Sequence, residues 1–153
     1  MEHIENTAAF MDEYRLLLEQ GDELPLPVLG DSMAPFLIDR RDMVWLRAPQ
    51  RTLKVGDMVL YQRSSGAYIL HRICAADDGV YTLIGDAHVV REPNIRAEQI
   101  FGVVVRARRK DAIQRPGCLW WEFFARVWPR VIPHRPALLR FYSRITKPFR
   151  RTL

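Results

Sequence analysis

The sequence predicts a mainly β fold: a coiled β-sheet or partly closed barrel with an N-terminal helix and a C-terminal helical tail. Three observations lead to this fold class. Short apolar runs recur between turn-forming residues through the middle of the chain, a helix-periodic segment precedes them, and an aromatic segment divided by prolines follows them. Several short strands at this spacing favour a coiled sheet or barrel over βαβ units.

The first segment is predicted to form a helix over about residues 7–20, because its apolar side chains recur at intervals of three and four. Asn6 or Thr7 can cap this helix, and Gly21 is placed to end it. The sequence of residues 24–29, Leu-Pro-Leu-Pro-Val-Leu, is then extended, because each proline biases the preceding residue away from the helical region. This extended segment delivers Ser32 at the end of a strand.

The central part of the chain predicts a series of strands. The apolar runs that we assign to strands are residues 43–48, 58–62, 67–75, 80–84 and 100–107. Runs of Gly, Asp, Ser and Lys separate them as turns, at residues 54–57, 64–66 and 77–79. Strands of this number and spacing predict a coiled sheet or partly closed barrel.

The tail differs from the rest in charge and composition. Residues 1–105 carry 10 Lys and Arg against 16 Asp and Glu, a net charge of −6, whereas residues 106–153 carry 13 against 2, a net charge of +11. Prolines divide the tail into two short predicted helices, each apolar on one side and arginine-rich on the other. We expect these helices to pack on the β-domain, with peripheral membrane contact through residues 118–151 as a compatible role. A nucleic-acid surface ranks third, and no DNA partner is expected.

The chain is expected to need no metal or other cofactor. Its two cysteines, Cys74 and Cys118, have neither the spacing of a metal pair nor that of a disulfide framework. The N-terminus is acidic and lacks the features of a signal peptide, and no run approaches the roughly 18 to 20 apolar residues of a membrane span. The expected localisation is therefore cytoplasmic or peripheral to a membrane.

Three clusters carry residues that could perform catalysis. Ser32 lies in the run Gly-Asp-Ser-Met-Ala-Pro of residues 30–35, and His71 lies inside an apolar strand. A serine hydroxyl becomes a good nucleophile when a base removes its proton, and a carboxylate such as Asp86 or Glu92 can orient that base. Each cluster alone also has an ordinary structural explanation, as a turn, a helix cap or a buried histidine with a partner.

Taken in order, these clusters resemble the ordered sequence boxes of the signal peptidase and LexA-like superfamily of serine peptidases. The similarity covers about residues 24–107. The matching boxes are Gly30-x-Ser32-Met33-x-Pro35, a strand ending in Asp42, Lys54-Val55-Gly56-Asp57-Met58-Val59, His71-Arg72, Gly85-Asp86-Ala87 and Gly102-Val103-Val104. Histidine followed by arginine is similar to the endoplasmic-reticulum and sporulation type of these enzymes, which use a histidine base, rather than to the lysine-base type.

The resemblance implies a Ser-His dyad in which Ser32 is the nucleophile and His71 the general base. Lys54 matches a structural turn of the family, so a lysine base is not expected. The catalytic acid is either Glu92, which stands where the family usually has aspartate, or Asp86. His88, where the family often has asparagine, is interpreted as a polar loop residue.

The resemblance also implies an oxyanion and substrate-binding region at Gly30, Asp31 and Met33, with the backbone N–H of Ser32 as a donor. It divides the chain into an N-terminal helix (1–22), a peptidase domain (23–110) and a basic aromatic tail (111–153).

The function that follows is a serine endopeptidase that cleaves a peptide or precursor protein lying extended along a sheet edge. The alternative is a catalytically silent peptide-binding or regulatory module with the same fold. Secretory preprotein processing is disfavoured because no membrane anchor is evident. A self-cleaving repressor is disfavoured because about thirty residues precede Ser32, too few for a DNA-binding domain and a cleavage site.

Overall fold

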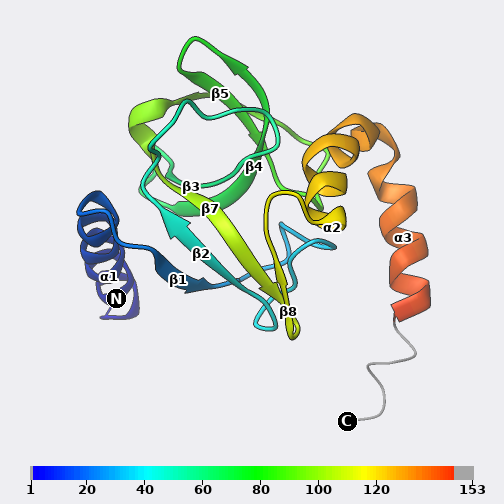
Figure 1. The fold of residues 1–153 in the computed structure, drawn as a ribbon, viewed down its shortest axis with the longest axis horizontal. Coiled ribbons are helices and arrows are strands. Elements are labelled where there is room, and N and C mark those ends of the chain that lie inside the picture. Colours follow the sequence, from blue (N-terminus) through cyan, green and yellow to red (C-terminus); the bar gives the residue numbers. More distant parts are fainter. Residues whose placement is uncertain (1, 147–153) are drawn as a thin grey trace.

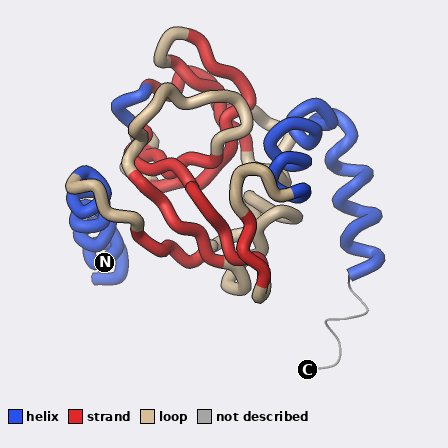
Figure 2. The backbone as a smooth tube through the Cα atoms, in the orientation of Figure 1, coloured by secondary structure: helices blue, strands red, loops and turns tan. Residues whose placement is uncertain are grey.

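The computed structural model describes residues 2–146 and consists mainly of one antiparallel β-sheet. Helix α1 (Glu2–Glu19) lies at one end of this sheet and a run of C-terminal helices at the other (Figures 1 and 2). The mainly β prediction with a helix at each end is therefore confirmed. The first helix begins earlier than the sequence pattern suggested and ends one residue sooner.

The sheet has eight strands within the described residues, and every pairing is antiparallel. The strands are β1 (Leu24–Pro27), β2 (Met43–Arg47), β3 (Met58–Gln62), β4 (Tyr68–Asp77), β5 (Val80–Ile84), β6 (Glu92–Arg96), β7 (Ile100–Arg109) and β8 (Ala112–Gln114). They run in the order β1-β2-β7-β3-β4-β5-β6, and β8 pairs with β7. Since β1 and β6 do not pair with each other, the sheet is not closed. All five expected central strands are present, and β6 and β8 are additional.

Strand β3 lies in the middle of the sheet, where four of its five residues are buried. Its register with β4 sets Val59 opposite His71 and Tyr61 opposite Ile69. Strand β5 pairs with β4 only from Arg72 onward. The beginning of β4 therefore has an edge that β5 does not cover, and His71 lies where that open edge ends.

Two hydrophobic clusters fill the interior. The first joins α1 to β2, β7 and the loop after β1, and the second lies between β3, β4, β5 and β6. The helix contributes Met11, Tyr14 and Leu18 to the first cluster, and the Tyr14 hydroxyl donates a hydrogen bond to the Leu24 carbonyl. The N-terminal helix is thus part of the same core as the sheet.

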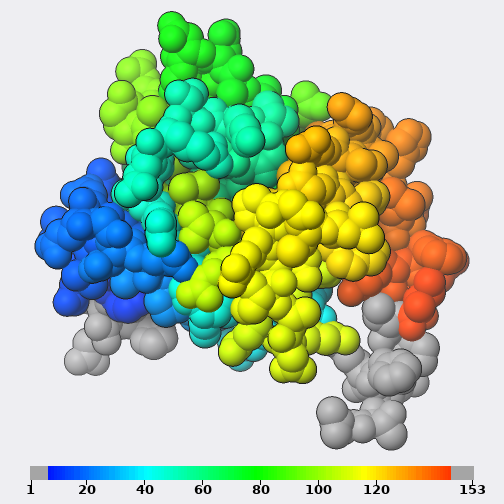
Figure 3. Space-filling view, viewed as in Figure 1, coloured from blue at the N-terminus to red at the C-terminus, as the bar shows by residue number. Residues whose placement is uncertain are grey.

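The tail forms one winding helical path rather than two separate short helices. Its elements are α2 (Leu119–Glu122), the π-helix η2 (Phe123–Val127), the 3₁₀-helix η3 (Trp128–His134) and α3 (Arg135–Thr146); a further 3₁₀ turn, η1, spans Ala97–Gln99. Trp121, Phe124 and Trp128 are buried in the same cluster as Phe36. The expected packing of tail aromatics on the β-domain is therefore confirmed for these side chains, and the segment from α2 to η3 lies against the body of the molecule (Figure 3).

Candidate active site

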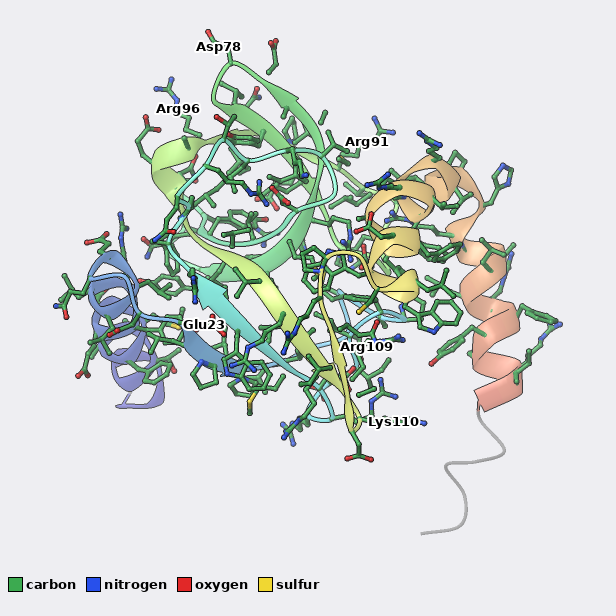
Figure 4. All side chains as sticks on the ribbon, viewed as in Figure 1. Glu23, Asp78, Arg91, Arg96, Arg109 and Lys110 are labelled. Atoms are coloured by element: carbon green, nitrogen blue, oxygen red, sulfur yellow. The ribbon has the colours of Figure 1, made fainter. Side chains whose placement is uncertain are left out.

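Ser32 lies in the loop between β1 and β2, which core side chains hold in place. Met33, Phe36 and Leu37 of this loop are almost completely buried. Arg109, near the end of β7 (Figure 4), donates from Nε to the Phe36 carbonyl at 2.6 Å, and its guanidinium lies 4.9 Å from the centre of the Phe36 ring. Ser32, itself only partly exposed, is therefore presented by a fixed loop.

His71 reaches the same place from β4. Its side chain is buried, with 5% of the residue exposed. The turn after β5 connects the two segments, because the Ala87 backbone N–H donates to the Ser32 carbonyl at 2.9 Å. Three segments far apart in sequence thus meet around one point.

Gly85 marks that point. A Cβ atom added to Gly85 would lie 2.6 Å from the Ser32 carbonyl oxygen, 2.8 Å from Nδ1 of His88 and 3.2 Å from Nε2 of His71. Real Cβ atoms essentially never approach other atoms as closely as the first two distances. Glycine is therefore required here by close approach, and Nε2 of His71 faces the Ser32 side of the site.

The other ring nitrogen of His71 faces a polar group of three side chains. The Tyr61 hydroxyl lies 3.3 Å from His71 Nδ1 and donates to Glu92 Oε2 at 2.5 Å. Arg63 binds the same carboxylate through two hydrogen bonds, both of 2.8 Å. Glu92 thus approaches His71 through Tyr61 rather than by direct contact.

Burial keeps the His71 imidazole neutral. Burial above all, and then nearby His88, lower the pKa of His71 from its ordinary 6.5 to about 4, whereas Glu92 opposes the shift. The hydrogen bonds from Arg63 are the main cause of the lowered pKa of Glu92. Burial, and then the hydrogen bond to Glu92, raise the pKa of Tyr61. At neutral pH the site therefore contains a neutral imidazole, a neutral phenol and an ionised carboxylate.

Asp86, the other predicted candidate for the acid, contacts a different partner. Its fully buried carboxylate accepts two hydrogen bonds of 2.8 Å from Arg72, whose side chain is 1% exposed. Arg72 also donates to the Gly56 carbonyl at 2.9 Å. Neighbouring residues of a strand point to opposite faces. Arg72, and with it the Asp86 carboxylate that it binds, therefore lies on the face of β4 opposite to the His71 side chain. The geometry makes Asp86 half of a buried ion pair, and Glu92 the carboxylate linked to His71.

The C-terminal helices hold the turn that contains Gly85. Trp128 Nε1 donates to the Asp86 carbonyl at 2.8 Å. Arg135, which is completely buried, donates from Nη1 to the carbonyls of Gly85 and His88, both at 2.9 Å. Sequence reasoning assigned no role at the site to the tail, yet its side chains fix the turn against which Ser32 and His71 pack.

A cleft of about 350 Å³ opens beside Ser32 and His71. Most of its walls are apolar; they come from the end of β1, the beginning of β4 and helix α1. The lining residues are Thr7, Met11, Leu26, Pro27, Val28, Leu29, Gly30, Ser32, Met33, Arg63, Tyr68, Ile69, Leu70, His71 and His88. The predicted nucleophile and base thus share one cleft, bordered by the open edge of β4.

The remaining predicted residues have separate positions. Asp31 is exposed, Met33 is buried, and the Gly30 N–H donates to Asp39 Oδ1 at 2.8 Å. Lys54 is exposed in the turn before β3, where its backbone N–H donates to Asp57. His88, interpreted from sequence as an ordinary loop residue, has its ring centre 5.6 Å from that of His71.

Tyr61 and Arg63 were missed at the sequence level. Tyr61 belongs to the apolar strand β3, and Arg63 directly follows that strand. The local sequence gives no sign that either residue has a polar function. A signal existed in the alternation of the strand, because Tyr61 and Arg63 lie two residues apart and so share a face. The pairing with β4 that turns this face toward His71 is visible only in the fold.

Comparisons with known proteins add no relative. A scan against protein-family models gives no match, and no curated protein is similar enough in sequence to count as one.

Within residues 2–146, no group of three or more His, Cys, Asp and Glu side chains is arranged to hold a metal ion. In the same part of the chain no helix is both long and apolar enough to cross a membrane.

Proposed function

We propose that this protein is a serine endopeptidase of the signal peptidase and LexA-like type, with Ser32 as nucleophile and His71 as general base. One observation carries the proposal. Nε2 of His71 and the backbone of Ser32 meet at Gly85, while Nδ1 of the same ring is held on the other side by Tyr61. A base that is oriented at one nitrogen and open toward a serine at the other is the arrangement that acyl transfer requires.

In the proposed reaction, the Ser32 hydroxyl oxygen attacks the carbonyl carbon of the substrate peptide while His71 Nε2 takes its proton. The resulting imidazolium gives this proton to the leaving amine, and the C–N bond breaks to leave an acyl group on Ser32. Water then attacks the acyl carbon, again losing a proton to Nε2, and the proton returns to the Ser32 oxygen as the product acid leaves. The low pKa of His71 leaves the imidazole unprotonated at neutral pH, as a general base must be, and also makes it a weaker base than an exposed histidine.

The developing oxyanion needs a hydrogen-bond donor near Ser32. The Gly30 N–H, which lies in the oxyanion region expected from the sequence, already donates to Asp39 and is not free for this role. The backbone N–H of Ser32 is the remaining candidate. Exposed Asp31 adjoins this position and adds an unfavourable negative charge, so the proposed site stabilises the oxyanion weakly.

The proposed substrate is an extended peptide or a precursor protein with apolar side chains next to the cleaved bond. The cleft is lined by apolar groups such as Val28, Ile69 and Leu70. The open edge of β4 beside His71 offers unpaired backbone groups to such a chain. A strand added there would lie across the entrance to Ser32.

The second candidate function is a peptide-binding module without catalysis. Among the described residues, no hydrogen bond joins the Ser32 hydroxyl to His71, which favours this alternative. Catalytic hydrogen bonds often shorten only when substrate is bound, so the enzyme remains the proposal that the geometry supports better.

Cleavage of a peptide library by the purified protein, read by mass spectrometry, separates the two functions. The proposal expects cleavage by the wild type, loss of cleavage in Ser32→Ala and in His71→Ala, and unchanged cleavage in Ser65→Ala, a control at an exposed turn serine. Binding of peptides without cleavage by the wild type would support the silent module instead.

We also propose that the tail contacts an anionic membrane surface. Trp120 is 52% exposed and Phe141 65%, and an apolar groove of about 430 Å³ lies between η2 and α3. Exposed Arg140 and Arg144 adjoin Phe141 on α3. Aromatic side chains with flanking arginines suit the interface of an anionic bilayer. Residues 147–151 of the expected contact segment lie outside the described residues.

Liposome flotation tests this contact. Deletion of the tail would also remove core side chains such as Trp121, so the test uses surface substitutions. Trp120→Ser with Phe141→Ser is expected to reduce flotation with anionic liposomes, whereas Leu16→Ser, at an exposed apolar position on α1, is the control. Equal flotation of all three proteins would contradict the proposal.

A further inference from the structure

The hydroxyl of Tyr61 lies between two polar atoms, the Glu92 carboxylate and His71 Nδ1, and has only one proton to donate. Glu92 Oε2 lies at 2.5 Å from it and His71 Nδ1 at 3.3 Å. Glu92 is ionised, because its hydrogen bonds from Arg63 lower its pKa, and a carboxylate only accepts hydrogen bonds. The Tyr61 proton therefore points to Glu92, and a lone pair of the Tyr61 oxygen faces His71.

That direction fixes the state of the imidazole. A neutral histidine carries its proton on one ring nitrogen and a lone pair on the other. Since the Tyr61 oxygen presents a lone pair, Nδ1 must carry the proton and donate it. Nε2 then has the free lone pair, and it faces Gly85 and the Ser32 loop. This is the tautomer in which a histidine can act as base toward the serine.

We propose that Tyr61 is a positioning residue that transmits the charge of Glu92 to His71 and so sets the catalytically competent tautomer. This inference rests on the proposed function. It replaces the direct carboxylate–imidazole contact that the sequence suggested with a chain of three groups, Glu92, Tyr61 and His71. Tyr61 itself is completely buried and does not line the cleft, so it orients the base without touching the substrate.

The sheet holds these groups in register. Val59 is opposite His71 and Tyr61 is opposite Ile69, so Tyr61 and His71 are diagonal neighbours on one face of β3 and β4. Aromatic side chains at such diagonal positions are long enough to meet. Arg63, two residues beyond Tyr61, lies on the same face and fixes both carboxylate oxygens of Glu92, the first residue of β6.

Arg63 also limits how strongly Glu92, acting through Tyr61, stabilises the His71 imidazolium. Its positive charge offsets most of the charge of Glu92, so the imidazolium formed during the reaction is stabilised by the oriented Tyr61 dipole more than by a free negative charge. We therefore expect Tyr61→Phe to lower kcat by about 10- to 100-fold, a smaller loss than the roughly 10⁴-fold seen when a direct aspartate partner is neutralised. KM should stay within about twofold, because Tyr61 lies outside the cleft lining.

The test is nitrogen-15 NMR of the histidine side chains at neutral pH, with the His71 signals assigned from the His71→Ala spectrum. The wild type is expected to show protonated Nδ1 and bare Nε2 at His71. Tyr61→Phe should shift the population toward protonated Nε2. Glu92→Ala should do the same, because it frees the Tyr61 proton to point at Nδ1. The matched control is Tyr68→Phe, which removes from β4 a hydroxyl that donates a hydrogen bond to Asp12 of helix α1 and should leave the tautomer unchanged.

The NMR readout does not require activity, so the two proposals fail separately. Protonated Nε2 in the wild type, or an unchanged tautomer in both Tyr61→Phe and Glu92→Ala, would overturn the role of Tyr61. The expected tautomers in a wild type that cleaves no peptide would leave that role intact and remove the proposed peptidase. If Tyr61→Phe does not fold, Glu92→Ala alone decides the tautomer, since partly exposed Glu92 lies at the sheet edge.

Discussion

Neutralising Asp86 separates a structural role from a catalytic one at this site. In Asp86→Asn the side chain keeps its size, but one oxygen becomes an amide nitrogen that faces an Arg72 donor. Both side chains are almost completely buried, at 0% and 1% exposure, so the Arg72 charge would stay in the interior without a counter-charge. Removing one partner of such a pair typically costs about 3–5 kcal/mol of the free energy of unfolding.

That loss is large for a domain of this size, since total stabilities lie near 5–15 kcal/mol. It corresponds to a fall of about 6–20 °C in Tm for a chain of 153 residues. Urea unfolding followed by circular dichroism measures the change. Glu19→Gln, which breaks the exposed Arg15–Glu19 pair of α1, is the control and should cost less than about 0.5 kcal/mol.

The double variant Asp86→Leu with Arg72→Met sharpens the test, because a well-packed apolar pair often replaces a buried ion pair without loss. We expect it to recover most of the stability lost in Asp86→Asn. At temperatures where Asp86→Asn is folded, the kcat of this single variant should stay within about tenfold of the wild-type value. An Asp86→Asn protein as stable as the wild type, with kcat reduced a thousandfold or more, would refute this reasoning and make Asp86 the catalytic acid.

Three further outcomes follow from the same geometry. Gly85→Ala should lower kcat/KM by about 100-fold or more, measured with a cleaved peptide, because the new Cβ at 2.6 Å forces the Ser32 carbonyl to move; unchanged kinetics would contradict the close approach. Arg135→Met should speed amide hydrogen exchange at residues 85–88, because two carbonyls lose their donor, whereas exchange equal to the wild type would argue against this support. Because burial lowers the pKa of His71 to about 4, the unfolded chain binds a proton there below pH 6.5 while the folded chain does not. Stability should therefore fall as the pH drops from 6.5 to 4, by on the order of 3 kcal/mol, and His71→Gln should remove this dependence in urea titrations at several pH values; the same dependence in His71→Gln would assign it to other groups.

Sequence reasoning predicted the strands well because their apolar runs are bounded by turn residues, as at residues 58–62. It did not find β6, whose Glu-Pro-Asn-Ile-Arg sequence has few strand-forming residues and pairs only because β5 lies beside it. The course of the helical tail was also missed, since prolines at 129 and 133 are accommodated by η3 rather than ending the path.

The candidate site was predictable in its two main groups and not in their surroundings. Ser32 and His71 are found from order and spacing along the chain. The choice between Asp86 and Glu92 depends on which face of β4 each carboxylate meets, and this is set by strand pairing. The contributions of Tyr61 and Arg135 arise from contacts between residues 10 to 50 positions apart, which no local pattern encodes.

The identity of the nucleophile is the central claim, and a covalent adduct tests it most directly. The protein is treated with a serine-reactive fluorophosphonate at neutral pH, and the modified peptide is located by mass spectrometry. We predict a single adduct on Ser32, absent in Ser32→Ala, strongly slowed in His71→Ala and formed at the wild-type rate in Ser65→Ala. An adduct at another residue, or labelling that persists without Ser32, would contradict the account.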